Sequence, residues 1–217
     1  MSKSEIKKYS SLKAVLLEST KTVTIKISDD ELKNLKGNDY MLCFAKKVGD
    51  NLYNVVWQAY DKYLSDNVFS WTPQYQLFGT NNFTSGAKVS TRTNIVTIGL
   101  GQSSTLDQYG LLNAPVSGGP GTSVTLNNSY GNIYPGVNQI CTGIDGSIIS
   151  APTYVAEKAS IKGNIVSYTP TEKVAVWFQQ DIETSTMINN INGNPVEIDL
   201  NLADSATRLY SNGKWRT

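Results

Sequence analysis

The segment Thr22-Val-Thr-Ile-Lys-Ile-Ser28 alternates apolar and polar side chains along its whole length. Side chains two residues apart lie on the same face of a β-strand, so Val23, Ile25 and Ile27 form one apolar face. The pattern predicts a strand with one buried side and one exposed side. Segments of similar character recur along the chain, and together they decide the fold class.

Further short segments rich in β-branched and aromatic residues follow, separated by Gly, Asn and Pro. Residues 40–48 and 52–60 are predicted to form a hairpin around Gly49-Asp50-Asn51. Short strands punctuated by turn residues are typical of a sandwich or barrel. We therefore predict an all-β fold, an antiparallel β-sandwich of the jelly-roll type. The other predicted strands are residues 74–79, 87–91, 94–100, 103–106, 123–126, 153–157, 162–168, 173–179, 196–200 and 207–210.

One short helix is expected directly after the first strand. Ser28-Asp-Asp-Glu31 matches a capping box, in which the first and last side chains satisfy each other's free backbone amides. Leu32 and Leu35 supply an apolar stripe, and Gly37 can provide a left-handed stop. These features predict a helix over residues 29–36.

Residues 1–18 form a lysine-containing lead-in ahead of the first strand. Ile6, Tyr9, Leu12 and Leu16 recur at spacings of three and four, which fits one face of a helix. The apolar run that begins at Leu12 fits a strand equally well, so both alternatives stay open.

The rest of the chain, residues 19–217, contains no internal repeat or linker and is expected to form a single sandwich domain. The N-terminal region shows neither the apolar core of a secretory signal nor a run long enough to span a membrane. We therefore expect a cytoplasmic protein, with leaderless export as an alternative.

Composition excludes several functional classes. The chain has 217 residues, among them 22 Ser, 20 Thr, 20 Asn and 17 Gly, and no histidine. The 21 aromatic side chains argue against a disordered chain, and a net charge of +1 argues against nucleic-acid binding. The missing histidine removes the commonest general base and metal ligand. There is also no phosphate loop or dinucleotide fingerprint, so we expect no metal and no cofactor.

The two cysteines leave one alternative open. Cys43 lies in the apolar segment Met-Leu-Cys-Phe-Ala, and Cys141 follows Gln-Ile just before a Gly-Ile-Asp-Gly loop. They are either two buried reduced thiols, which behave as small apolar side chains, or a disulfide that spacing alone cannot establish.

Carboxylate pairs are the only catalytic candidates. Glu197 and Asp199 lie two apart in a predicted strand and therefore share a face, as do Asp181 and Glu183 if that segment is extended. Glycosidases place two carboxyl groups on opposite sides of the scissile bond, whereas same-face charges usually protect a strand edge from pairing. We expect a non-enzymatic protein, with a glycoside hydrolase as the remaining enzymatic alternative.

Charge is distributed unevenly along the chain. Eleven of the 16 lysines lie in residues 1–62, whereas residues 93–156 contain no Lys or Arg and only two acids, Asp107 and Asp145. Soluble surfaces normally mix charges of both signs, while protein interfaces are poor in Lys, Glu and Asp and rich in aromatics. Residues 93–156 are therefore where we expect contacts with a partner.

Aromatic side chains stand among amides in two segments, residues 69–83 and 128–138. A neutral sugar is bound by a flat aromatic face together with amide or carboxylate groups. Our leading hypothesis is lectin-like recognition of a glycan or glycoprotein surface through long Asn-, Gly- and Tyr-rich loops. The alternative is that the aromatics are core and the asparagines form turns. The candidate ligand-binding residues are Trp71, Tyr75, Asn81, Asn82, Tyr130, Asn132 and Tyr134.

Two further functions are compatible with the sequence. The first is a self-assembling structural protein, a homo-oligomer, filament, crystal or inclusion, with residues 93–156 as the subunit interface. The second is a membrane-active, pore-forming sandwich protein in which the lead-in enters the bilayer. No residue-level motif supports membrane insertion, because the apolar face of the lead-in is short and flanked by Lys7, Lys8 and Lys13.

Overall fold

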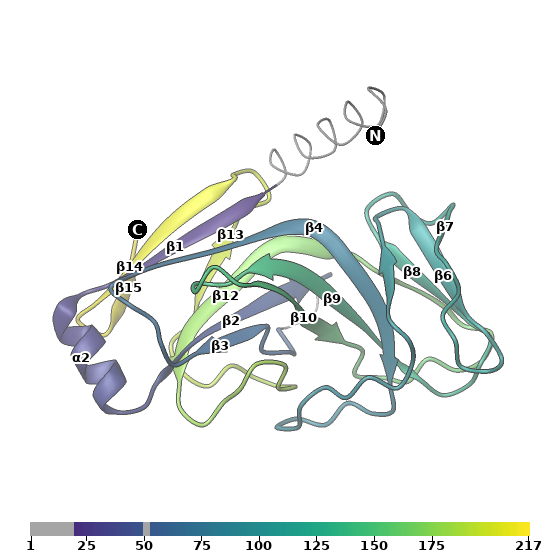
Figure 1. The fold of residues 1–217 in the computed structure, drawn as a ribbon, viewed down its shortest axis with the longest axis horizontal. Helices are drawn as coiled ribbons and strands as arrows, with labels where there is room; N and C mark the ends of the chain where they lie inside the picture. The colour runs from purple at the N-terminus through teal and green to yellow at the C-terminus, as the bar shows by residue number, and fades with distance from the viewer. Residues whose placement is uncertain (1–19, 50–52) are drawn as a thin grey trace.

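The structure is a computed structural model that describes residues 20–49 and 53–217 (Figure 1). The predictions for the lead-in, residues 1–18, lie outside the described residues. Strands arranged in three sheets dominate the described part, where α2 (Asp29–Gly37) is the single helix.

Three sheets build the molecule. The large sheet runs in the order β10 (Ile148–Val155), β9 (Tyr134–Thr142), β4 (Asp66–Thr80), β1 (Lys21–Ile27), β14 (Ser205–Ser211) and β15 (Lys214–Arg216), and β5 (Val96–Ile98) pairs with β4. The second sheet runs in the order β13 (Val196–Asp199), β12 (Pro170–Gln179), β2 (Met41–Val48) and β3 (Gln58–Tyr60). The small sheet runs in the order β11 (Ile165–Tyr168), β8 (Val124–Asn128), β6 (Gln102–Leu106) and β7 (Val116–Ser117).

The architecture is an all-β sandwich, as the alternation in residues 22–28 predicts. Val23, Ile25 and Ile27 of β1 are buried, while Lys26 faces solvent. The sheets are not wholly antiparallel, however, because β1 pairs with β14 and β6 pairs with β8 in parallel. The partners β1 and β14 come from opposite ends of the described chain, so only a long crossover connects them.

Strand β4 links the two halves of the sandwich, and Figure 1 shows it bending along the length of the molecule. Before the bend, Phe69 and Trp71 pack into the main core against the second sheet; after it, Tyr75 and Leu77 pack into a second core against the small sheet. Proline cannot donate to a strand ladder, and Pro73 lies where the β4–β9 register shifts. The missing N–H of Pro73 therefore falls where the β4–β9 ladder is interrupted.

Helix α2 forms where it is predicted, but it is not capped as predicted. Ser28 makes no side-chain cap hydrogen bond, so the capping box does not form. The Glu31 carboxylate instead accepts a hydrogen bond from the backbone N–H of Gly213, at 2.5 Å, in the turn between β14 and β15. Gly37 is not the left-handed residue either, because Asp39 adopts the positive φ of 54°. The Ser28 amide, which Glu31 would satisfy in a capping box, donates to Tyr210 O of β14 at 3.1 Å.

The predicted hairpin of residues 40–48 and 52–60 forms only in part. Strand β2 matches its first arm, but the second arm is reduced to β3, which pairs Tyr60 with Leu42 and Gln58 with Phe44. Residues 54–56 instead bond to a later loop: Val56 N donates to Thr186 O at 2.8 Å. The second arm therefore leaves the hairpin to pair with a distant segment.

Strand β9 is the largest departure from the sequence-based prediction. Most of residues 113–146 is expected to be loop because of its Gly, Pro and Asn content, yet β9 is a central strand between β4 and β10. Gly136 lies directly opposite Phe78 of β4, and a Cβ atom on Gly136 would approach Phe78 Cζ to 2.2 Å. The glycine is needed because the buried Phe78 ring occupies the space above it.

Substituting Gly136 by alanine is expected to lower the free energy of unfolding by about 2 kcal/mol, the middle of the range for overpacking a dense core. Phe78 is buried among Val55, Val155 and Met187, so its ring has little room to move. Chemical denaturation measures the change. Gly37→Ala is the matched control, because nothing lies within 4 Å of its added Cβ. Equal stability of the two variants would contradict this account of β9.

Candidate functional site

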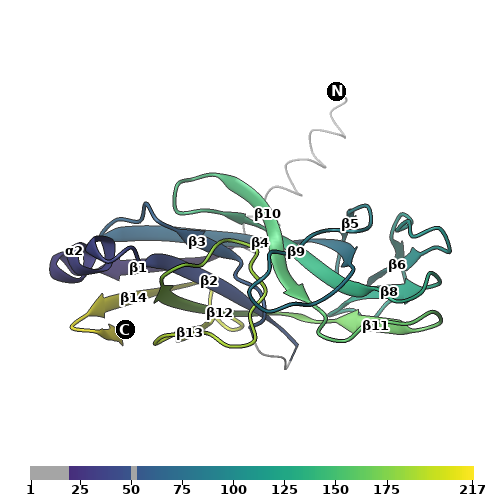
Figure 2. The same cartoon turned by 90° about the horizontal axis from the view of Figure 1, so that it is seen from below.

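The small sheet and its loops form one end of the molecule (Figure 2). We term residues 94–131 and 161–168 the small-sheet end. Its inner face is apolar: Leu106, Val124 and Leu126 pack against Tyr75 and Leu77 of β4. Core packing therefore fixes the position of this end and leaves its outer face available for contacts.

The outer face of the small sheet carries no charged side chain in its paired rows. One row holds Thr105, Asn127 and Ile165, which the β6–β8 and β8–β11 registers place side by side. In the neighbouring row Thr125 Oγ1 and Ser167 Oγ are joined by a 2.8 Å hydrogen bond. Thr125 itself is buried, so the uncharged side chains that this face exposes include Ser167 and Ile165.

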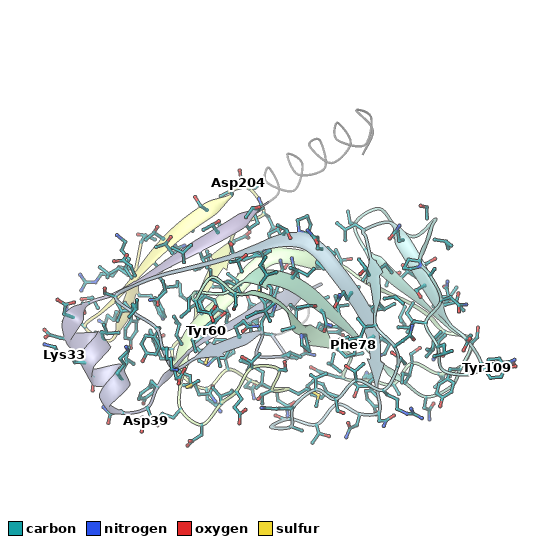
Figure 3. All side chains as sticks on the ribbon, viewed as in Figure 1. Lys33, Asp39, Tyr60, Phe78, Tyr109 and Asp204 are labelled. Carbon is teal, nitrogen blue, oxygen red and sulfur yellow. The ribbon has the colours of Figure 1, made fainter. Side chains whose placement is uncertain are left out.

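Exposed apolar side chains concentrate at this end. Tyr109, 77% exposed, lies at the opposite extreme of the long axis from Lys33 of α2 (Figure 3). The two charged residues of the small-sheet end are Asp107 and Lys162, and Asp107 accepts backbone hydrogen bonds from Tyr109 and Leu111. Of the twelve large apolar side chains exposed in the described chain, eight belong to the small-sheet end: Ile95, Leu100, Tyr109, Leu111, Val116, Tyr130, Ile161 and Ile165.

The structure does not bring the seven candidate ligand-binding residues together. Trp71 and Tyr75 are each 1% exposed and belong to the two cores, so the ligand role proposed for them is corrected to packing. Asn81 and Asn82 are exposed in the loop after β4, where Asn82 Nδ2 donates to Thr84 Oγ1. Their place in an exposed turn fits the structural alternative.

The other three candidates come from the β8–β9 region. Tyr130 and Asn132 are exposed, while Tyr134 begins β9 and packs against the cluster around Phe78. Of the seven candidates, Tyr130 alone lines the small cavity at this place, which measures about 30 Å³. That volume is close to one water molecule and far below the several hundred Å³ of a typical ligand site. No saccharide fits there.

An ion pair between a buried lysine and a glutamate that is 22% exposed lies between the two main sheets, and sequence analysis missed it. Lys46 of β2 has a fully buried side chain, and its Nζ lies 2.8 Å from Glu172 Oε2. The same carboxylate oxygen accepts a hydrogen bond from Trp71 Nε1 at 2.5 Å. Lys46 Nζ also lies 4.7 Å from the centroid of the Trp71 ring and 5.7 Å from that of Trp57, a cation–π arrangement.

Burial determines the electrostatics of this pair. Desolvation lowers the pKa of Lys46 to about 8, although the neighbouring Glu172 carboxylate opposes the shift. A depressed lysine pKa is a common mark of a reactive amine. The Lys46 amine is closed off from solvent, however, and is surrounded by the Glu172 carboxylate and the indoles of Trp57 and Trp71. We therefore treat the pair as part of the fold.

The carboxylates weighed as catalytic candidates occupy two different settings. Glu197 and Asp199 lie on β13, at the edge of the second sheet, where both approach Lys173 Nζ, at 3.6 and 3.1 Å. Tyr53 also donates its hydroxyl to Glu197 at 2.8 Å. This arrangement is that of a charged sheet edge. Asp181 and Glu183, in contrast, line a cavity that is described below.

The two cysteine thiols are enclosed in the fold. Cys43 and Cys141 are both free and buried, and burial raises the pKa of the Cys141 thiol to about 12. Within residues 20–49 and 53–217, no three Cys, Asp or Glu side chains are grouped so as to hold a metal ion. Over the same residues, no helix is long and apolar enough to cross a bilayer.

Comparison with known proteins gives no relative: the chain matches no protein-family model, no curated protein and no solved structure at a significant level.

Proposed function

We propose that this chain is a non-enzymatic structural protein that associates with a second copy of itself through the small-sheet end. The observation that carries the proposal is the concentration there of eight of the twelve large apolar side chains exposed in the described part of the chain, with two charged residues. Monomeric proteins seldom leave such side chains grouped on one surface, and grouped exposed apolar side chains usually mark an interaction site.

The energetics favour burial of this end. Removing apolar surface from water contributes about 25 cal/mol per Å², and the side chains that project here are aliphatic or aromatic. Burying a charge without a partner costs several kcal/mol, but the outer face of the small sheet has no charge in its paired rows. Association therefore gains hydrophobic free energy with little electrostatic penalty.

A second copy is the partner that suits this surface. In a two-fold dimer a surface patch faces the identical patch of the other chain. A patch with charges of one sign would therefore repel its copy. An uncharged patch meets its copy without repulsion. A strongly charged partner, in contrast, would lose hydration without gaining an ion pair. The opposite end of the molecule differs, because Asp29, Asp30, Glu31, Lys33 and Lys36 of α2 surround it with charge.

Placing like charges on this surface is expected to weaken association strongly. Val116→Lys combined with Ile165→Lys puts two cations on the small-sheet end of each copy, where both native side chains are exposed. Like charges across an interface cost several kcal/mol, so we expect the dimer Kd to rise about 100-fold or more. Sedimentation velocity over a concentration series measures the Kd.

The matched control is Ile148→Lys combined with Leu202→Lys, because these two exposed residues lie outside the small-sheet end. Ile148 belongs to residues 93–156, so the control also separates the small-sheet end from the rest of that charge-poor segment. We expect the control to associate as the native chain does. Equal dissociation of both double variants would contradict the proposed interface.

A further inference from the structure

A cavity of about 450 Å³ lies away from the small-sheet end, beside the final residues of β12. It opens between the loop after β4 and the loop that follows β12. Its volume falls within the range of roughly 300–1,000 Å³ that small-molecule sites occupy. None of the seven candidate ligand-binding residues lines it.

Backbone hydrogen bonds hold the two loops together and pre-form the cavity. Gly86 N donates to Met187 O at 2.8 Å, and Met187 N donates back to Ala87 O at 2.9 Å. One step further on, Val89 N donates to Ser185 O at 2.9 Å. The Met187 side chain is buried in the core, which anchors the second loop. A site held by such a ladder loses little entropy when a ligand binds.

Two aliphatic side chains are among the mostly polar residues that line the cavity. Ile182 and Ile188 line it, and both are buried against the outer face of the second sheet, in a cluster with Cys43, Ala175 and Trp177. The C–H groups of a ligand can pack against these two side chains. The ligand that fits best therefore has one apolar face and polar groups around its edge.

The walls carry one unpaired carboxylate and several amides. Lys88 and Glu183 form an ion pair with each other, which neutralises both. Asp181 makes no hydrogen bond or ion pair with any residue that the structure describes. Its backbone adopts a positive φ of 52°, a conformation that is rare outside glycine and that Asp and Asn tolerate best. The lining amides that make no side-chain hydrogen bond to a described residue are Asn189, Asn190 and Asn192.

We propose that this cavity binds a neutral saccharide. The carboxylate of Asp181 accepts hydrogen bonds from adjacent hydroxyls, the asparagine amides donate to ring and hydroxyl oxygens, and the C–H face of the sugar rests on Ile182 and Ile188. Acidic ligands are disfavoured because Glu183 already pairs with Lys88 and leaves no free cation among the described lining residues. This inference is independent of self-association through the small-sheet end.

The test is a titration of the full chain with methyl glycosides of common neutral hexoses, followed by amide chemical shifts. We expect at least one glycoside to shift amides of residues 85–88 and 181–192 while leaving the small-sheet end unchanged. Asp181→Asn keeps the backbone preference and removes the charge. We expect it to weaken binding about tenfold, since hydrogen bonds to a charged group are worth about 1.5–3 kcal/mol.

Asp39→Asn is the matched control, because Asp39 is also exposed with a positive φ of 54° and lies outside the cavity. It should bind as the native chain does. Three outcomes would overturn the proposal: no shift with any neutral glycoside up to its solubility, equal binding of glucuronic acid, or binding of tetramethylammonium in preference to the glycosides. The last outcome would identify the cavity as a site for cations.

Discussion

Replacing Glu172 by glutamine is expected to lower the free energy of unfolding by about 1–2 kcal/mol at neutral pH. This is less than the ~3–5 kcal/mol typical of a fully buried ion pair, because the Glu172 side chain is 22% exposed and Lys46 can release its proton. Lys46 is 0% exposed in its side chain, and Glu172 supplies the negative charge at 2.8 Å. Without that charge, the amine must either stay ionised in an apolar core or lose its proton. Both alternatives cost free energy relative to the unfolded chain.

A second variant shows whether the loss is electrostatic. Lys46→Met keeps most of the side-chain volume and removes the charge, and the amide oxygen introduced by Glu172→Gln can still accept from Trp71 Nε1. We expect Lys46→Met combined with Glu172→Gln to recover most of the lost stability. Urea denaturation of the native chain and three variants measures the coupling. A Glu172→Gln variant as stable as the native chain would contradict this account.

The second large effect is the dependence of stability on pH. The pKa of Lys46 is about 8 in the folded chain, whereas the ordinary value of 10.5 applies when the chain unfolds. Between these pH values the unfolded state binds more protons at Lys46 than the folded state does, so stability from this residue rises with pH. We expect a gain of about 3 kcal/mol from pH 8 to pH 10.5 relative to Lys46→Met.

The comparison with Lys46→Met is needed because other groups act in the opposite direction. Burial raises the pKa of Cys43 and of Cys141, from an ordinary value of 9.0. Above pH 9 these thiols lose protons in the unfolded state first, so their contribution to stability falls as pH rises. The effect is common to both proteins and largely cancels in the difference. A difference in stability that does not change with pH would contradict the depressed pKa of Lys46.

Local patterns predicted the elements that depend on local physics. The alternation in residues 22–28 and the apolar stripe after Ser28 both led to the correct element, β1 and α2. Strand β9 was missed because Pro135 and Gly136 are typical of loops, and the reason for that glycine is the Phe78 ring on another strand. Because the need for Gly136 comes from Phe78, which is distant in sequence, the residues around Gly136 do not indicate a strand.

The buried ion pair was within reach of sequence analysis. In β2, Leu42, Phe44 and Lys46 share the inward face, and in β12 Glu172 precedes Val174 on the face that points into the same core. A charged residue that continues an apolar face at each of two strands suggests a pair. The cavity was not within reach, because backbone bonds between loops about 100 residues apart bring Gly86 and Met187 together.

The charge-poor segment overlaps the surface that we propose for self-association, but the two differ in extent. Residues 93–156 were expected to make contacts because they lack Lys and Arg. In the structure, part of that segment forms β9 and β10 of the large sheet, and exposed apolar side chains gather mainly at the small-sheet end, which also includes Ile161 and Ile165. Composition alone does not show which uncharged residues are buried and which are exposed. The fold determines that difference.

The most direct test of self-association is the mass of the native chain in solution, measured by sedimentation equilibrium over a concentration series at low and at high salt. An interface that is apolar and uncharged should persist at high salt, because screening weakens ion pairs and leaves hydrophobic burial intact. We predict that the mass rises from 23.7 kDa toward twice that value, with the same Kd at both salt concentrations. A chain that remains at 23.7 kDa at every concentration, or a dimer that dissociates in salt, would contradict the proposal.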